Sequence, residues 1–145
     1  MPFTETQPGD ERVGPREGRV LIVCGDLFFG TQVASVVREA GLDPLPEMLA
    51  ERTLGHLADS AVIAVLLDLE TRGVDPAALL ASLPASRPRV VAFGPHVQTQ
   101  RLEAARAAGC DAVLSRGQVT SSASLLRRVL LGEDEPSSSP ETEDA

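Results

Sequence analysis

A run of apolar residues, Ala61 to Leu67, ends on the carboxylate Asp68. The length of this run and its β-branched residues predict a strand buried on both faces, as found at the centre of a parallel sheet. Ligands of open α/β sheets bind outside the carboxyl ends of the strands. Asp68 is therefore predicted to lie at the edge of the sheet where proteins of such a fold bind their ligands.

Strand and helix patterns alternate along the middle of the chain. Short apolar runs predict strands at 19–23, 44–48, 61–68, 89–93 and 112–114. Helical patterns lie between them at 27–40, at 51–57, after Asp75-Pro76 and at 100–108, and Thr120 or Ser121 is predicted to cap a final helix that runs through Leu131. We therefore expect an α/β fold, (βα)₅, with a five-stranded parallel sheet inside a three-layer α/β/α sandwich.

The strand order 2-1-3-4-5 fits this pattern best. It places the second strand at an edge of the sheet, where Pro44 and Pro46 are tolerated because an edge strand needs fewer backbone donors.

The formal net charge of −8 comes from the two ends of the chain. Four acids and two arginines fall in 1–17, six acids and no base fall in 132–145, and 18–131 holds equal numbers of acids and arginines. The low apolar content of both ends predicts a disordered N-terminal segment, 1–17, a domain, 18–131, and a disordered, acidic and Ser-rich tail, 132–145. A neutral domain also argues against nucleic acid as a partner.

The sequence holds no apolar segment long enough to cross a membrane and no apolar core of a secretory signal near Met1. Its two cysteines do not make a disulfide framework. We expect a cytoplasmic, reduced protein that does not bind membranes.

Residues from several strand ends meet at one edge of the predicted sheet, and at this point the chain resembles the receiver domain of bacterial two-component response regulators, a flavodoxin-like fold. The segment Leu66 to Glu70, followed by Gly73-Val74-Asp75, resembles the phosphoacceptor strand of that family and the loop after it. The segment Ala104 to Ala112 resembles the family's fourth helix and its exit. The resemblance covers about residues 19–131.

The family's chemistry is the phosphorylation of an aspartate, with Mg²⁺ held by that aspartate and by an acid pair after the first strand. The resemblance places Asp68 at the phosphoacceptor position. Cys24 and Gly25 occupy the positions of the acid pair, and Asp26 follows one position late, so the acidic pocket is degenerate and Glu70 is its other carboxylate. The two switch positions, a hydroxyl and a lysine in the family, hold Gly94 and Arg116.

These substitutions favour a degenerate, or pseudo-receiver, variant with no metal site and no cofactor. A hard cation needs several oxygen ligands, and only Asp26 and Asp68 are candidates for a weak alternative site. Asp26 is also expected to cap the helix at 27–40, and Arg116 is expected to pair directly with Asp68.

Three functions remain open. The first is a stand-alone signalling module that is not an enzyme and acts through protein–protein interaction, with a histidine kinase or another signalling protein as its partner. The second is a working receiver phosphorylated on Asp68 with Mg²⁺ in a phosphorelay. The third is a small enzyme on the same fold. The resemblance also allows a homodimer, through a face to which Leu125, Leu126, Val129 and Leu130 contribute in part.

Overall fold

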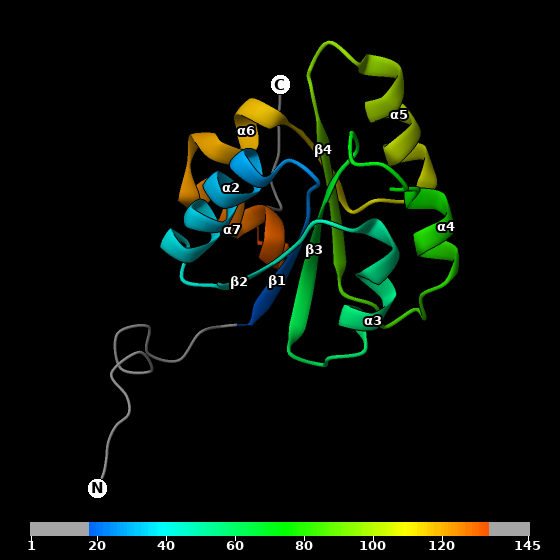
Figure 1. The fold of residues 1–145 in the computed structure, drawn as a ribbon, viewed down its shortest axis with the longest axis horizontal. Helices are drawn as coiled ribbons and strands as arrows, with labels where there is room; N and C mark the ends of the chain where they lie inside the picture. Colours follow the sequence, from blue (N-terminus) through cyan, green and yellow to red (C-terminus); the bar gives the residue numbers. More distant parts are fainter. Residues whose placement is uncertain (1–17, 134–145) are drawn as a thin grey trace, which may run out of the picture.

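A five-stranded parallel sheet runs through the middle of the molecule, with helices on both of its faces (Figure 1). The structure is a computed structural model and describes residues 18–133; the expected disorder of 1–17 and of most of 132–145 lies outside these residues. The strands follow the order β2-β1-β3-β4-β5 and comprise β1 Arg19–Val23, β2 Asp43–Glu47, β3 Val62–Asp68, β4 Arg89–Gly94 and β5 Ala112–Ser115. The predicted fold class and strand order are confirmed.

Strand β2 forms an edge of the sheet, as its prolines predict. The Asp43 N–H donates to the Gly18 carbonyl and the Glu47 carbonyl accepts from the Cys24 N–H, so alternate residues of β2 face β1. Pro44 and Pro46 therefore face away from β1, where their missing N–H groups cost no ladder hydrogen bond. The outer edge of β2 offers carbonyl groups at these two positions and no donor.

Two sets of helices cover the two faces of the sheet (Figure 1). On one face lie α2 Leu27–Glu39, α6 Arg116–Ser121 and α7 Ala123–Leu131, which pack on a core that includes Ile22, Leu66 and Phe93. On the other lie the 3₁₀ turn η2 Ala50–Arg52 and the helices α3 Thr53–Leu57, α4 Pro76–Ala81 and α5 Thr99–Ala108. This second face packs on Leu21, Leu67 and their neighbours.

The C-terminal helical region differs from the prediction of one helix capped by Thr120 or Ser121. Both residues lie inside a separate short helix, α6, and the cap of α7 is Ser122, whose hydroxyl accepts from the Leu125 N–H. The prediction was wrong because Ser115 already closes a capping box with Gln118 and starts a helix directly after β5. This helix decides where Arg116, its first residue, lies.

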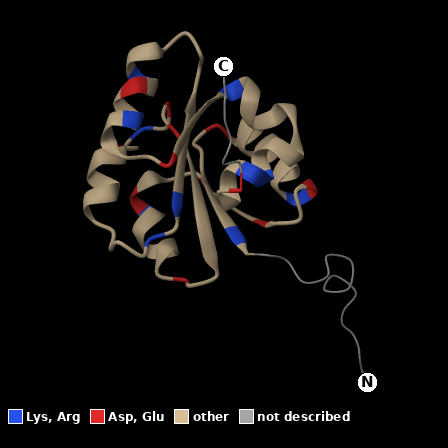
Figure 2. Cartoon of the chain, turned by 180° about the vertical axis from the view of Figure 1, so that it is seen from behind, with Lys and Arg blue, Asp and Glu red and all other residues tan. Residues whose placement is uncertain are grey.

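No helix within 18–133 has both the length and the apolar character needed to cross a membrane. Figure 2 shows arginines and acids interspersed along the helices and strands of residues 18–133.

Candidate functional site

Asp68 is the last residue of β3 and is almost fully buried at the carboxyl edge of the sheet, with 2% of its surface exposed. Its Oδ1 accepts a hydrogen bond of 2.9 Å from the Glu70 N–H, and its Oδ2 lies 3.3 Å from the Cys24 thiol. The carboxylate is thus held in one orientation by the turn that follows it and by the end of β1.

Arg116 brings a positive charge to this edge from the first position of α6. Its guanidinium lies 3.1 Å from Glu70 Oε1, 3.6 Å from Asp26 Oδ2 and 3.9 Å from Asp68 Oδ2. The expected pairing with Asp68 is therefore the longest of the three contacts, and the shortest is to Glu70. One guanidinium faces three carboxylates that come from the ends of β1 and β3.

Phe29 fixes the position of that guanidinium from the other side. The Arg116 Cζ lies 3.9 Å from the centroid of the Phe29 ring, a cation–π contact, and Phe29 packs in turn on the buried Phe93. An arginine suits this position because its planar group can stack on the ring while its N–H groups point at carboxylates. The sequence contains the Phe28-Phe29 pair, but only the packing of α2 beside α6 shows that Phe29 meets Arg116.

Asp26 serves the helix as well as the site. Its Oδ1 accepts from the Phe29 N–H at 3.1 Å, which confirms the predicted N-cap of α2, while its Oδ2 faces Arg116. The preceding residue, Gly25, donates its N–H to the Thr71 hydroxyl at 2.8 Å. A side chain at Gly25 would start 3.3 Å from the Thr71 methyl carbon, so the loop after β1 and the loop after β3 are tied closely together. Sequence reasoning missed Thr71, because nothing in its local pattern indicates a bond across 46 positions.

Cys24 and Gly94 are both buried and place no oxygen side chain at this edge. Burial, assisted by the neighbouring Asp68, raises the pKa of the Cys24 thiol to about 12, even though its own bond to the Asp26 carbonyl works the other way. The thiol is therefore protonated at neutral pH and acts as a weak donor to Asp68. Gly94 is buried at the end of β4 beneath Leu69 and Leu102.

An open hollow of about 490 Å³ lies at the carboxyl edge, and its lining includes Asp26, Asp68, Glu70 and Arg116 together with Met48 and Leu49. Among residues 18–133, no three His, Cys, Asp or Glu side chains are arranged to hold a metal ion. The donor set does not fit Mg²⁺ because a fixed cation, Arg116, already lies within 4 Å of all three nearby carboxylates. Cys24 and Gly25 add no oxygen side chain.

The same arrangement of strands and helices occurs in solved structures of response regulators. A putative response regulator from Chloroflexus aurantiacus superposes with a TM-score of 0.67 at 17% identity, and the match covers 80% of this chain and 99% of that one. The chain has the fold of response regulator receiver domains. An orphan response regulator of H. pylori matches with a TM-score of 0.65, 13% identity, and coverage of 80% and 99%.

A third similar structure is a response regulator protein from Burkholderia pseudomallei, determined with a phosphorylated aspartic acid, a calcium ion and citrate. Its TM-score is 0.63 at 16% identity, and the match covers 78% of this chain and 66% of that one. No protein-family model matches the sequence, and no curated protein sequence does. At these identities the receiver fold is what the comparisons establish.

Proposed function

We propose that residues 18–131 form a receiver-like signalling module that acts by binding protein partners in the cytoplasm, without Mg²⁺-dependent phosphorylation of Asp68. The observation that carries the proposal is the position of Arg116, within 4 Å of Asp26, Asp68 and Glu70. In this reading the arginine supplies the positive charge that a divalent cation brings to receiver domains.

The contacts around Arg116 support a fixed state rather than a switching one. The guanidinium is held by Phe29 on one face and by carboxylates on the other, and its backbone begins a helix closed by the Ser115–Gln118 capping box. Moving Arg116 away would expose Phe29 and leave the buried Asp68 carboxylate with weaker compensation. Each of these costs favours the position that the structure shows.

Asp68 is also a poor nucleophile in these surroundings. Phosphoryl transfer depends mostly on positive groups that offset the charge of the transferred phosphoryl and its three oxygens. Here Arg116 is already engaged by three carboxylates, and the thiol of Cys24 stands where a metal-binding acid would be needed. The phosphorelay remains the second candidate, because Asp68 does end β3 at the edge where ligands of this fold bind.

The test is to incubate the protein with phosphoramidate and Mg²⁺ and to measure its intact mass. We expect no gain of a phosphoryl group in the wild type. The matched positive control is Cys24→Asp with Arg116→Lys, which restores one acid and a lysine and is expected to gain the group on Asp68. A gain in the wild-type protein that Asp68→Asn abolishes would overturn the proposal in favour of a working receiver.

A further inference from the structure

Five of the six exposed large apolar side chains of residues 18–133 lie shortly after the carboxyl end of a strand, and the sixth, Leu54, lies in α3. The five follow strands β1, β2 and β4, in loops or in the first turn of α2. We call them the carboxyl-edge patch: Leu27, Phe28, Met48, Leu49 and Val97. Such a concentration is typical of an interaction surface, since scattered apolar residues would fall on all sides.

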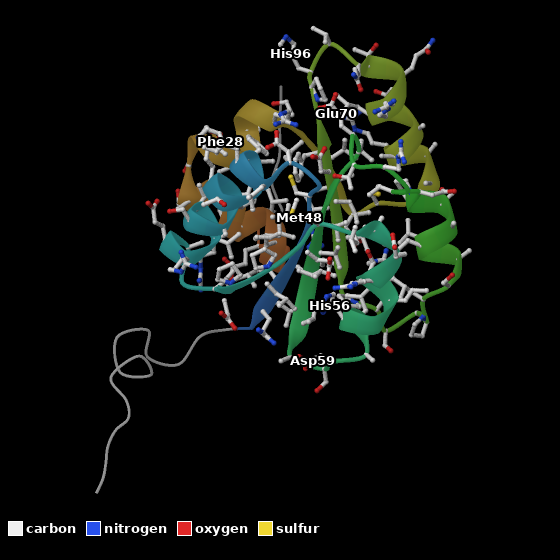
Figure 3. The ribbon with its side chains drawn as sticks, in the orientation of Figure 1. Phe28, Met48, His56, Asp59, Glu70 and His96 are labelled. Atoms are coloured by element: carbon white, nitrogen blue, oxygen red, sulfur yellow. The ribbon has the colours of Figure 1, made fainter. Side chains whose placement is uncertain are left out.

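Phe28 is the most exposed member, with 84% of its surface accessible, and its neighbour Leu27 is 67% exposed. Figure 3 shows Phe28 on α2 and Glu70 after β3 in the upper half of the molecule, with Met48, after β2, below them near the middle. Met48, Leu49, Gly25 and Asp26 all line the hollow, and a side chain at Gly25 would start 3.7 Å from the Met48 carbonyl oxygen. Apolar residues from two neighbouring strand ends thus lie at or next to the hollow, with Met48 and Leu49 in its lining and Leu27 directly after Asp26.

The hollow carries an excess of negative charge. Four carboxylates line it against two guanidinium groups, those of Arg72 and Arg116. Glu51 is an exposed member of this lining, and no ion pair joins it to another residue of 18–133. A partner that enters the hollow is therefore favoured if it brings a positive charge.

Hydrogen bonds hold in place the segments after β1 and β2 that carry the exposed apolar residues. On the β1 side, Asp26 caps the helix that carries Leu27 and Phe28. On the β2 side, Glu47 accepts from the Leu49 N–H at 2.9 Å and lies 2.8 Å from His56 Nε2. The hydrogen bond from His56 lowers the pKa of Glu47, so Glu47 is ionised at neutral pH and accepts both hydrogen bonds. A preorganised surface loses little conformational entropy when a partner binds.

We propose that the carboxyl-edge patch and the hollow together form the docking surface for a protein segment that combines apolar side chains with a lysine or arginine. The apolar side chains of the segment cover Leu27, Phe28, Met48 and Leu49, and the cationic side chain enters the hollow near Glu51. This inference names the chemistry of the partner and rests on the proposed function, in which the site binds proteins.

The test is a selection from a phage library of random peptides against the full chain, with Glu51→Arg as the counter-selected variant. We expect enriched peptides to combine apolar residues with at least one lysine or arginine. Their binding should fall at least tenfold with Glu51→Arg or Phe28→Ser. Binding should be unchanged with Glu103→Arg, a matched charge reversal on the exposed face of α5.

Amide chemical shifts measured with one selected peptide locate its site, and we expect changes at 26–29 and 47–51. The inference is overturned if no peptide is enriched, if the enriched peptides are acidic or purely apolar, or if the shifts fall elsewhere. These outcomes are separate from failure of the proposed function, which a phosphoryl gain on wild-type Asp68 would show whether or not peptides bind.

Discussion

Two of the arginine clusters in residues 18–133 stand at opposite edges of the same sheet and differ in how their charges balance. At the amino edge, Arg87 meets one carboxylate, Asp111, through two contacts of 2.7 and 3.3 Å. At the carboxyl edge, Arg116 faces three carboxylates at 3.1, 3.6 and 3.9 Å. The Arg87–Asp111 pair is electrically neutral and joins two chain segments. The cluster around Arg116 has three carboxylates for one guanidinium and therefore keeps an excess of negative charge.

The Arg87–Asp111 pair is also part of the sheet. Asp111 Oδ2 accepts from the Val90 N–H at 2.8 Å, and the Asp111 N–H donates to the Val90 carbonyl at 2.8 Å, so this side chain extends the pairing of β4 with β5. No comparable backbone ladder depends on Glu70. The two clusters therefore predict different responses to substitution.

The largest effect is expected at the amino edge. Asp111→Ala removes the partner of Arg87 and leaves the Val90 N–H without its acceptor, which should cost about 2 kcal/mol of unfolding free energy. Denaturant unfolding monitored by circular dichroism measures this loss. The control is Glu103→Ala, which breaks the exposed Arg106–Glu103 pair and should cost about 0.5 kcal/mol or less. Equal losses in the two variants would remove the distinction between this cluster and an ordinary surface pair.

A smaller effect is expected at the carboxyl edge. Asp26→Ala removes the N-cap of α2 and should cost about 1 kcal/mol. Asp26→Asn keeps a capping oxygen and removes only the charge, and because two other carboxylates still face Arg116, stability should change by less than about 0.5 kcal/mol. If Asp26→Asn lowers the unfolding free energy as much as Asp26→Ala does, Arg116 requires the charge of Asp26 and the other two carboxylates do not replace it.

The pH dependence of stability should separate the amino-edge pair from the rest of the molecule. Burial tends to raise the pKa of Asp111, but the bonds from Arg87 and from the Val90 N–H outweigh it, and the pKa lies below its ordinary value. The folded state therefore holds this carboxylate ionised at pH values where the unfolded chain takes up a proton. Its contribution is complete above the unfolded pKa of about 3.9 and is lost as the pH falls through the lower folded value.

Urea unfolding of the wild type and of Asp111→Asn, followed from neutral pH to about pH 3, measures this contribution. The difference between the two proteins should be constant above about pH 5 and should shrink below about pH 4. A difference that stays constant over the whole range would mean that Arg87 does not lower the pKa of Asp111.

The smallest effect concerns the two cysteines, one beside each cluster. Cys24 is buried with a thiol pKa of about 12, and Cys110 is half-buried with a pKa that burial also raises. Since the thiolate is the reactive form, iodoacetamide should modify both slowly at neutral pH and should reach Cys110 first. Mass spectrometry of peptides from the labelled protein measures the order. Labelling of Cys24 in the folded protein as fast as in urea would contradict its burial against Asp68.

Much of the fold was predictable because each strand carries its own pattern. The apolar run before Asp68 identified β3, and Pro44 and Pro46 identified the edge position of β2. The N-cap Asp26 and the helix that follows Asp75-Pro76 were also predicted from local sequence, and both aspartates accept a capping hydrogen bond from the helix backbone. The short helix α6 was missed because the apolar periodicity of α7 dominates that part of the chain.

The site was less predictable because its contacts join distant segments. That Asp68 and Arg116 would lie at one edge followed from the strand order. The preference of the guanidinium for Glu70, its stacking on Phe29 and the bond from Gly25 to Thr71 depend on how the loops pack, and no local pattern encodes them.

The measurement that tests the role of Arg116 most directly is a Mg²⁺ titration of the wild type and of Arg116→Met, followed by the amide resonances of 24–29 and 68–71. Arg116→Met removes the cation and leaves Asp26, Asp68 and Glu70 with no opposite charge between them, so millimolar Mg²⁺ should shift these resonances and raise the unfolding temperature of the variant. The wild type should show neither change. Saturable shifts in the wild type, with Arg116 in place, would contradict the proposal that this arginine stands in for the metal.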